Sequence, residues 1–146
     1  MKVVLGFIAA VVATYLFAAV SYSQLNLASL VEMGLVVDAG TRLKATVHDL
    51  GGLALIYLPI IAVGLLIAFG VARLVLIWVP QLRTIGYMLA GFVALYTVEY
   101  ALGNVVASGT HPLHITMTTV GLLSQCIAGA IGGYVFVLMT RQTAEQ

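Results

Sequence analysis

The chain has 146 residues, of which 62% are hydrophobic and only 8% are charged, and its formal net charge is +1. Soluble domains carry about a quarter charged residues, so this composition excludes an ordinary water-soluble domain. The sequence has no basic cluster that would favour binding to nucleic acid. We therefore expect an integral membrane protein.

Four stretches are long and apolar enough to cross a bilayer as helices. A hydrocarbon core of about 30 Å requires about 20 helical residues. Segments of about ten alternating residues, which are typical of transmembrane strands, do not occur in the sequence. The sequence predicts one all-α membrane domain, residues 1–146, built as a four-transmembrane-helix bundle. Its spans are expected at about 3–20, 53–72, 85–107 and 115–140.

The positions of the basic residues predict how the bundle is oriented. Four of the six fall on one side of the four-span arrangement: Lys2, Arg73, Arg83 and Arg141. The other two, Arg42 and Lys44, stand in the first outer loop among acidic residues. Since basic residues favour the cytoplasmic side, we expect a multi-pass protein with cytoplasmic N- and C-termini.

The first outer loop, residues 21–52, is long enough to contain a helix. Ser29 followed three residues later by Glu32 matches a capping box, which predicts a helix start. Beyond it, apolar residues recur every three or four positions, with charged residues on the opposite face. This pattern is typical of an amphipathic helix in the membrane interface. We expect such a helix at about 29–50, with Gly51 and Gly52 turning the chain into the membrane.

Small residues mark two helix faces that are expected to contact other helices. In the fourth span, Gly129 and Gly133 are four residues apart, which allows another helix backbone to approach closely. In the third span, a stripe of small residues lies opposite the face that carries Glu99. Its members are Gly86, Ala90, Ala94, Thr97 and Ala101. The stripe predicts contact with another helix of the bundle or with a second subunit.

Glu99 is the main functional indication, because it is a carboxyl group near the middle of a membrane span. An ionised carboxylate facing lipid there costs about 3 kcal/mol, so we expect Glu99 to point into the bundle and to be protonated or partnered. Polar side chains at comparable depth in the other spans can supply hydrogen bonds. The predicted ligand- or ion-binding residues are Glu99, Tyr96, Tyr15, Thr14, Tyr57, Ser124 and Gln125.

These polar residues support two interpretations. In the first, it binds a proton, an ion or a small polar solute, and the protein mediates transport or permeation as a homo-oligomer. In the second, it is a polar clamp in a non-catalytic structural or assembly subunit of a membrane complex. Expected partners are therefore membrane lipid, further copies of the chain and other membrane subunits. The sequence has no nucleophile elbow, no paired acids in one span and no glycine-rich phosphate loop, which disfavours an enzyme.

The histidines provide a third interpretation. His48, His111 and His114 all fall on the outer side, and Asp49 adjoins His48. Imidazole and carboxylate groups can ligate zinc, copper or iron. Two loops would have to converge to form such a site, and no paired cysteines or metalloprotease motif accompany the histidines. The principal expectation is no cofactor, and the alternative is a metal- or haem-dependent membrane enzyme that uses these four residues.

Overall fold

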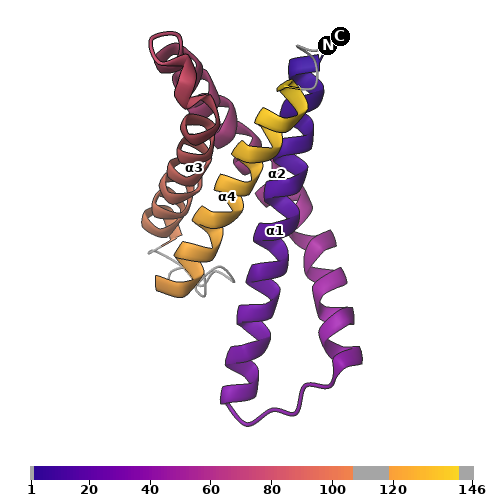
Figure 1. Cartoon of the computed structure of the whole chain (residues 1–146). Helices are drawn as coiled ribbons and strands as arrows, with labels where there is room; N and C mark the ends of the chain where they lie inside the picture. The colour runs from indigo at the N-terminus through magenta and orange to yellow at the C-terminus, as the bar shows by residue number, and fades with distance from the viewer. Residues whose placement is uncertain (1, 107–118, 142–146) are drawn as a thin grey trace.

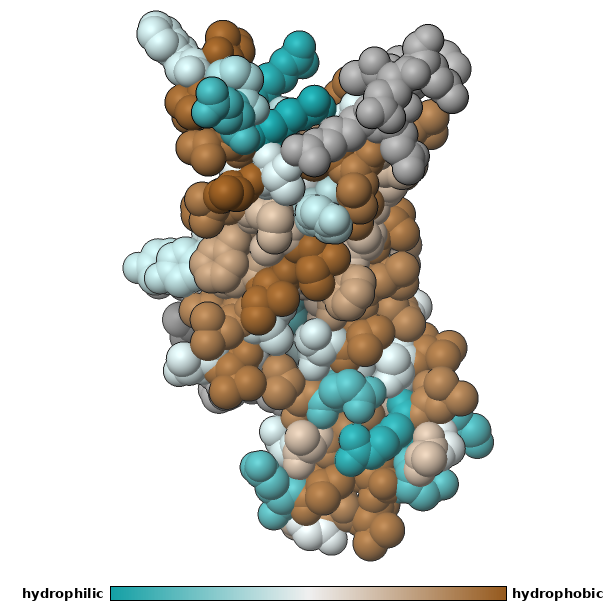
Figure 2. Space-filling view, in the orientation of Figure 1, coloured by the Kyte–Doolittle hydropathy of each residue, from teal (hydrophilic) through white to brown (hydrophobic). Residues whose placement is uncertain are grey.

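The computed structural model describes residues 2–106 and 119–141, which form four long helices and one short 3₁₀ helix. In chain order the elements are α1 (Lys2–Glu32), α2 (Ala39–Leu76), η1 (Pro80–Leu82), α3 (Arg83–Val106) and α4 (Thr119–Arg141). All four α-helices are long and apolar enough to cross a membrane, which is the architecture predicted for a multi-pass protein. Apolar side chains cover the middle of the molecule, while hydrophilic ones gather toward its two ends (Figure 2).

The helices run alternately up and down, so the start of α1, the α2–α3 connection and the end of α4 share one end of the bundle (Figure 1). The four basic residues that were expected on one side stand at or near these helix ends. Their common placement agrees with the prediction from the sequence. The cytoplasmic location of this end remains a prediction.

The first two helices are much longer than the predicted spans. At 1.5 Å per residue, the 31 residues of α1 and the 38 of α2 extend about 47 Å and 57 Å. The 24 residues of α3 and the 23 of α4 extend only about 36 Å and 35 Å. The distal parts of α1 and α2 therefore project beyond the other two helices (Figure 1). We call this part, residues 23–46, the projecting hairpin.

The predicted separate helix at 29–50 is replaced by this hairpin. Ser29 does not begin a helix but lies inside α1. Its hydroxyl donates to the carbonyl of Leu25, one turn earlier in the same helix (3.2 Å). The apolar run of α1 continues past the expected boundary, and a serine inside a helix can make this backward bond. α1 ends instead at Glu32, followed by Gly34 with a φ of 86°, a conformation that favours glycine.

The expected turn at Gly51 and Gly52 is also absent, since α2 continues through both residues. A glycine inside a helix is unfavourable by only about 1 kcal/mol relative to alanine, which the long helix on either side can offset. Polar contacts hold the two arms of the projecting hairpin together. The hydroxyl of Ser23 and the amide of Gln24 both donate to the Thr46 hydroxyl, at 3.1 and 3.2 Å.

Asp38 caps the N-terminus of α2. We expect the stability of this helix end to depend on pH, because the cap is an ionisable carboxylate. Its carboxylate accepts hydrogen bonds from the hydroxyl and the backbone N–H of Thr41, which lower the pKa of Asp38 below its usual value. A lowered folded-state pKa means that the stabilisation is complete above the usual value of 3.8 and is lost as the pH falls through the folded-state value. We expect amide protection factors at residues 39–42 to fall in acid.

Hydrogen exchange of the purified protein measures this effect. Asp38→Asn, which can still accept both bonds but carries no charge, should keep protection at the start of α2 without the acid-dependent loss. Asp38→Ala should remove protection at every pH. An acid dependence that persists in Asp38→Asn would show that another group controls the start of α2.

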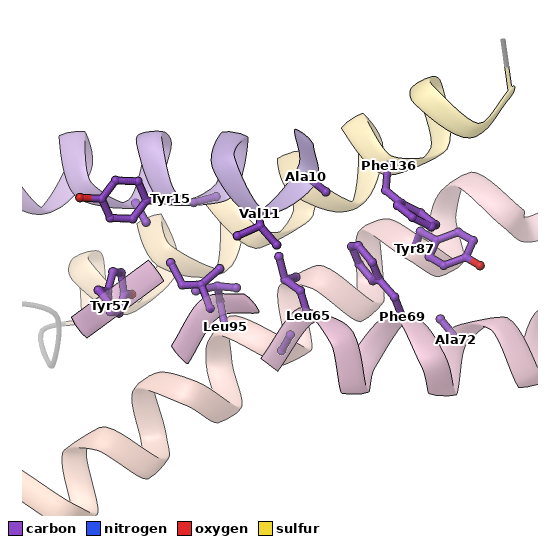
Figure 3. Close-up of a cluster of buried hydrophobic side chains, with 14 of the residues drawn as sticks. Ala10, Val11, Tyr15, Tyr57, Leu65, Phe69, Ala72, Tyr87, Leu95 and Phe136 are labelled. Atoms are coloured by element: carbon purple, nitrogen blue, oxygen red, sulfur yellow. The ribbon is translucent and has the colours of Figure 1, made fainter. Parts of the chain in front are cut away.

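The core of the bundle combines an aromatic cluster with close backbone packing. Phe69 of α2 lies against Tyr87 of α3 and Phe136 of α4, with ring centroids 5.5 and 4.8 Å away (Figure 3). Between α3 and α4, a Cβ on Gly129 would overlap the carbonyl oxygen of Gly91, and one on Gly133 would overlap that of Tyr87. The close approach predicted from Gly129 and Gly133 is therefore confirmed, with α3 as the neighbouring helix.

The small-residue stripe of α3 faces α2. Ala94 is buried, and a Cβ on Gly86 would lie 2.8 Å from the side chain of Leu76. The stripe also lines an apolar groove of about 980 Å³ between the two helices, opposite Pro59 and Val63. Its partner within the bundle is thus α2.

Candidate functional site

The carboxyl group of Glu99 is buried in the bundle, as predicted, with 6% of the residue exposed. The Tyr57 hydroxyl of α2 lies within hydrogen-bonding distance of Glu99 Oε1 in α3 and of Gln125 Oε1 in α4. The second of these distances is 3.1 Å. Three of the predicted residues therefore meet around one hydroxyl oxygen, each from a different helix. We call Tyr57, Glu99 and Gln125 the polar cluster.

A backbone carbonyl of α1, the one helix that contributes no side chain to the polar cluster, orients the cluster. The amide nitrogen of Gln125 donates to the carbonyl oxygen of Ala18 in α1, at 3.1 Å. A carbonyl oxygen can only accept, so the amide nitrogen must face Ala18 and Oε1 must face Tyr57. The chain of contacts from Ala18 through Gln125 and Tyr57 to Glu99 thus links all four helices, with Tyr57 facing Gln125 Oε1 as a possible donor.

These directions bear on the protonation state of Glu99. The Tyr57 hydroxyl has one hydrogen and can donate to only one of its two acceptor neighbours. If Glu99 is protonated, its own hydroxyl donates to Tyr57, and Tyr57 is then able to donate to Gln125. If Glu99 is ionised, Tyr57 donates to the carboxylate, and Gln125 Oε1 loses that donor. Only the protonated acid satisfies both contacts, and burial also favours the neutral form.

Tyr15 and Thr14 of α1 lie near this level but use their hydroxyl groups differently. The Tyr15 hydroxyl donates to the carbonyl of Leu50 and so ties α1 to α2 at the base of the projecting hairpin. Figure 3 shows Tyr15 and Tyr57 toward the same end of the core. Thr14 is fully buried, and its hydroxyl oxygen has no hydrogen-bond partner among the described residues. It packs directly against Gly132, where any Cβ would overlap it.

Tyr96 and Ser124, like Tyr15 and Thr14, do not join the polar cluster. Tyr96 is 47% exposed and stacks on Tyr100 of the next helical turn, with ring centroids 6.5 Å apart. Ser124 donates to the carbonyl of Gly121 within its own helix, at 2.7 Å. Neither side chain makes a hydrogen bond to Tyr57, Glu99 or Gln125.

The predicted metal ligands are only partly described. His48 is exposed on α2 and Asp49 is partly buried beside it. His111 and His114 lie outside the described residues. Within residues 2–106 and 119–141, no group of three or more His, Cys, Asp or Glu side chains is placed to hold a metal ion. The four-residue metal site is therefore untested.

Comparisons with protein-family models, with curated proteins and with solved structures find no match for this chain. The function must be inferred from the polar cluster itself. The contributions of Ala18 and Leu50 were missed in the sequence, because a backbone carbonyl that accepts a tertiary hydrogen bond has no sequence pattern. The same holds for Gly132, whose contact with Thr14 depends on the relative placement of α1 and α4.

Proposed function

We propose that the polar cluster is the proton-binding site of a small transport or permeation protein, and that Glu99 is the group that binds the proton. The observation that carries this proposal is the fixed donor order from Ala18 through Gln125 to Tyr57. It favours a protonated acid at a depth where an isolated ionised one would be unfavourable. Ionisable groups inside membrane spans commonly belong to proton or ion pathways.

Proton release from Glu99 would change how the helices are connected. In the protonated state, Tyr57 donates to Gln125 and joins α2 to α4. When the proton leaves, the Tyr57 hydrogen turns to the carboxylate, so the link between α2 and α3 is kept and the hydrogen bond between α2 and α4 is lost. The buried oxygen of Gln125 then lacks its donor, which is unfavourable by about 1–3 kcal/mol. Proton binding is thereby coupled to the packing of α4 against α2, and such coupling is what a proton-linked transporter requires.

The cellular arrangement is part of the same proposal. The two chain termini face the cytoplasm, in accord with the basic residues at that end, and the active form is a homo-oligomer. Four spans enclose little room for a translocation path within one subunit, which favours a path along a subunit interface. A proton, an ion or a small polar solute remains the class of substrate.

Glu99→Gln tests the role of the acid. The glutamine amide can donate to Tyr57 as the protonated carboxyl does, so we expect the variant to remain folded. It cannot release a proton, so proton flux into proteoliposomes under an imposed potassium diffusion potential should fall to that of protein-free liposomes. A pH-sensitive dye inside the vesicles measures the flux. The infrared band of a protonated carboxyl group should be present in the wild type and missing in the variant.

Glu32→Gln is the matched control, because it makes the same chemical change at the exposed end of α1. It should leave both the flux and the infrared band unchanged. Equal flux in the wild type and in Glu99→Gln would show that transport needs no proton release from Glu99, which leaves a structural clamp in a membrane assembly as its role. Purification of a defined complex with another membrane protein would support that second function.

A further inference from the structure

A second site lies at the end of the bundle that holds the α2–α3 connection, far from the polar cluster. It is a cleft of about 680 Å³ with contributions from all four α-helices and η1. Its volume is within the range of about 300–1,000 Å³ that is usual for sites of small molecules. Arg73 and Arg83 stand among its lining residues, and most of the remaining lining is apolar.

The apolar part of the cleft is formed by rigid packing. Phe69 lies between Phe7 and the pair Tyr87 and Phe136, with ring centroids 4.8–6.3 Å apart. These rings hold one another in place, and Leu66 extends the apolar wall toward the membrane interior. Gly70 adds space, because a Cβ there would meet no atom within 4 Å. The cleft can thus accept an extended hydrocarbon chain.

The two arginines supply a positive rim to this apolar cleft. One N–H of Arg83 donates to the Thr140 hydroxyl of α4 at 2.9 Å, which positions the guanidinium at the cleft. A guanidinium has five N–H donors, so others remain for an anion. Arg73 is exposed and lines the same cleft. Trp78, 87% exposed between them in sequence, is a residue type that favours the headgroup level.

No carboxylate of the described part of the chain lies near this rim. Glu32 ends α1, Asp38 immediately precedes α2, and Asp49 lies in the N-terminal part of α2, so all three are far along the helices from this rim. Glu99 is about 24 Å of helix rise beyond Arg83. The positive charge at the cleft is therefore not balanced by these acidic side chains.

We propose that this cleft binds an anionic phospholipid, with its phosphate between Arg73 and Arg83 and the upper part of an acyl chain against Phe69. Apolar lining below a pair of guanidinium groups at headgroup level matches that one molecule in both charge and shape. A free phosphate ion would leave the apolar wall unused. The site is independent of the polar cluster and of its proposed function.

Native mass spectrometry of the detergent-purified protein, with added lipid, tests the proposal. The probes are dioleoylphosphatidylglycerol, dioleoylphosphatidylcholine with the same chains, and inorganic phosphate. Each basic residue contributes about fivefold to the binding of anionic lipid, so the wild type should prefer the anionic lipid by about thirtyfold. Arg73→Gln should reduce this preference to about fivefold. Excess inorganic phosphate should displace little lipid.

Two matched pairs of variants distinguish lipid binding in the cleft from non-specific attraction of anionic lipid to positive charge. Arg42→Gln removes a charge at the opposite end and should leave the preference unchanged. Gly70→Leu fills the cleft without removing charge and should lower binding of the anionic lipid about tenfold, the effect of losing about two buried methylene groups. Gly51→Leu, in the same helix with equally open surroundings, should have no effect.

Several results would overturn the proposal. Equal losses from Arg42→Gln and Arg73→Gln would reduce it to non-specific charge attraction. Equal binding by Gly70→Leu and the wild type would show that no chain enters the cleft. Displacement of the lipid by inorganic phosphate at comparable concentration would indicate a simple anion site.

Discussion

Replacing Gly129 with alanine should destabilise the bundle by about 3 kcal/mol, the upper part of the usual range for overpacking. A Cβ at this position would overlap the carbonyl carbon and oxygen of Gly91, and the reverse holds for a Cβ on Gly91. Neither group can rotate away, because both belong to the backbones of regular helices. The helices α3 and α4 would have to separate, and their packing around Leu95 would loosen. Unfolding in mixed micelles with increasing denaturing detergent, followed by circular dichroism, measures the loss.

Gly70→Ala is the control for this prediction. Its Cβ would meet no atom within 4 Å, so the variant should gain up to about 1 kcal/mol from the better helix propensity of alanine. The double variant Gly91→Ala with Gly129→Ala should lose less than the sum of the single losses, since the first change already opens the contact. If Gly129→Ala were as stable as Gly70→Ala, α3 and α4 would not approach each other as closely as described.

The sequence predicts the number of membrane helices and part of their packing for a clear physical reason. An apolar stretch long enough to cross a bilayer has few alternatives to a helix, because backbone groups in lipid need internal hydrogen bonds. Close approach at Gly129 follows from the absence of side chains. The helix ends are less predictable. Ser29 fits a helix start and also a helix interior, and only the continuation of α1 distinguishes the two.

The sequence predicts how far along each helix the site residues stand, but not which way each side chain points. Tyr57 and Gln125 share the depth of Glu99, and both reach the centre of the bundle. Tyr96 is one turn from Glu99 on the same helix but turns outward. Residues three apart on a helix lie about 60° from each other around its axis. Because α3 packs closely on α4, only a narrow face of α3 is buried. Whether a residue at the edge of this face is buried depends on how α3 is placed against its neighbours, and no local sequence pattern gives that placement.

Tyr57→Phe should destabilise the protein by about 2 kcal/mol, because hydrogen bonds between membrane helices contribute about 0.6–1.7 kcal/mol each and this hydroxyl takes part in two. The ring itself remains, so the packing of α2 is retained. Tyr96→Phe removes the same atom from a residue that is 47% exposed and should change stability by less than about 0.5 kcal/mol. The same micelle-unfolding experiment measures both. Equal effects of the two substitutions would show that the polar cluster does not join the helices.

Tyr57→Phe also tests whether Glu99 carries a proton. If Glu99 is protonated, Glu99→Gln presents Tyr57 with a neutral donor much like the original one. Tyr57→Phe should then be about equally unfavourable in the wild type and in the Glu99→Gln background. If Glu99 is ionised, Tyr57 donates to a charge, and such bonds are roughly twice as strong as neutral ones. Tyr57→Phe would then be distinctly more unfavourable in the wild type. A difference below about 0.5 kcal/mol between the two backgrounds, within the usual error of additivity, supports the neutral acid on which proton binding depends.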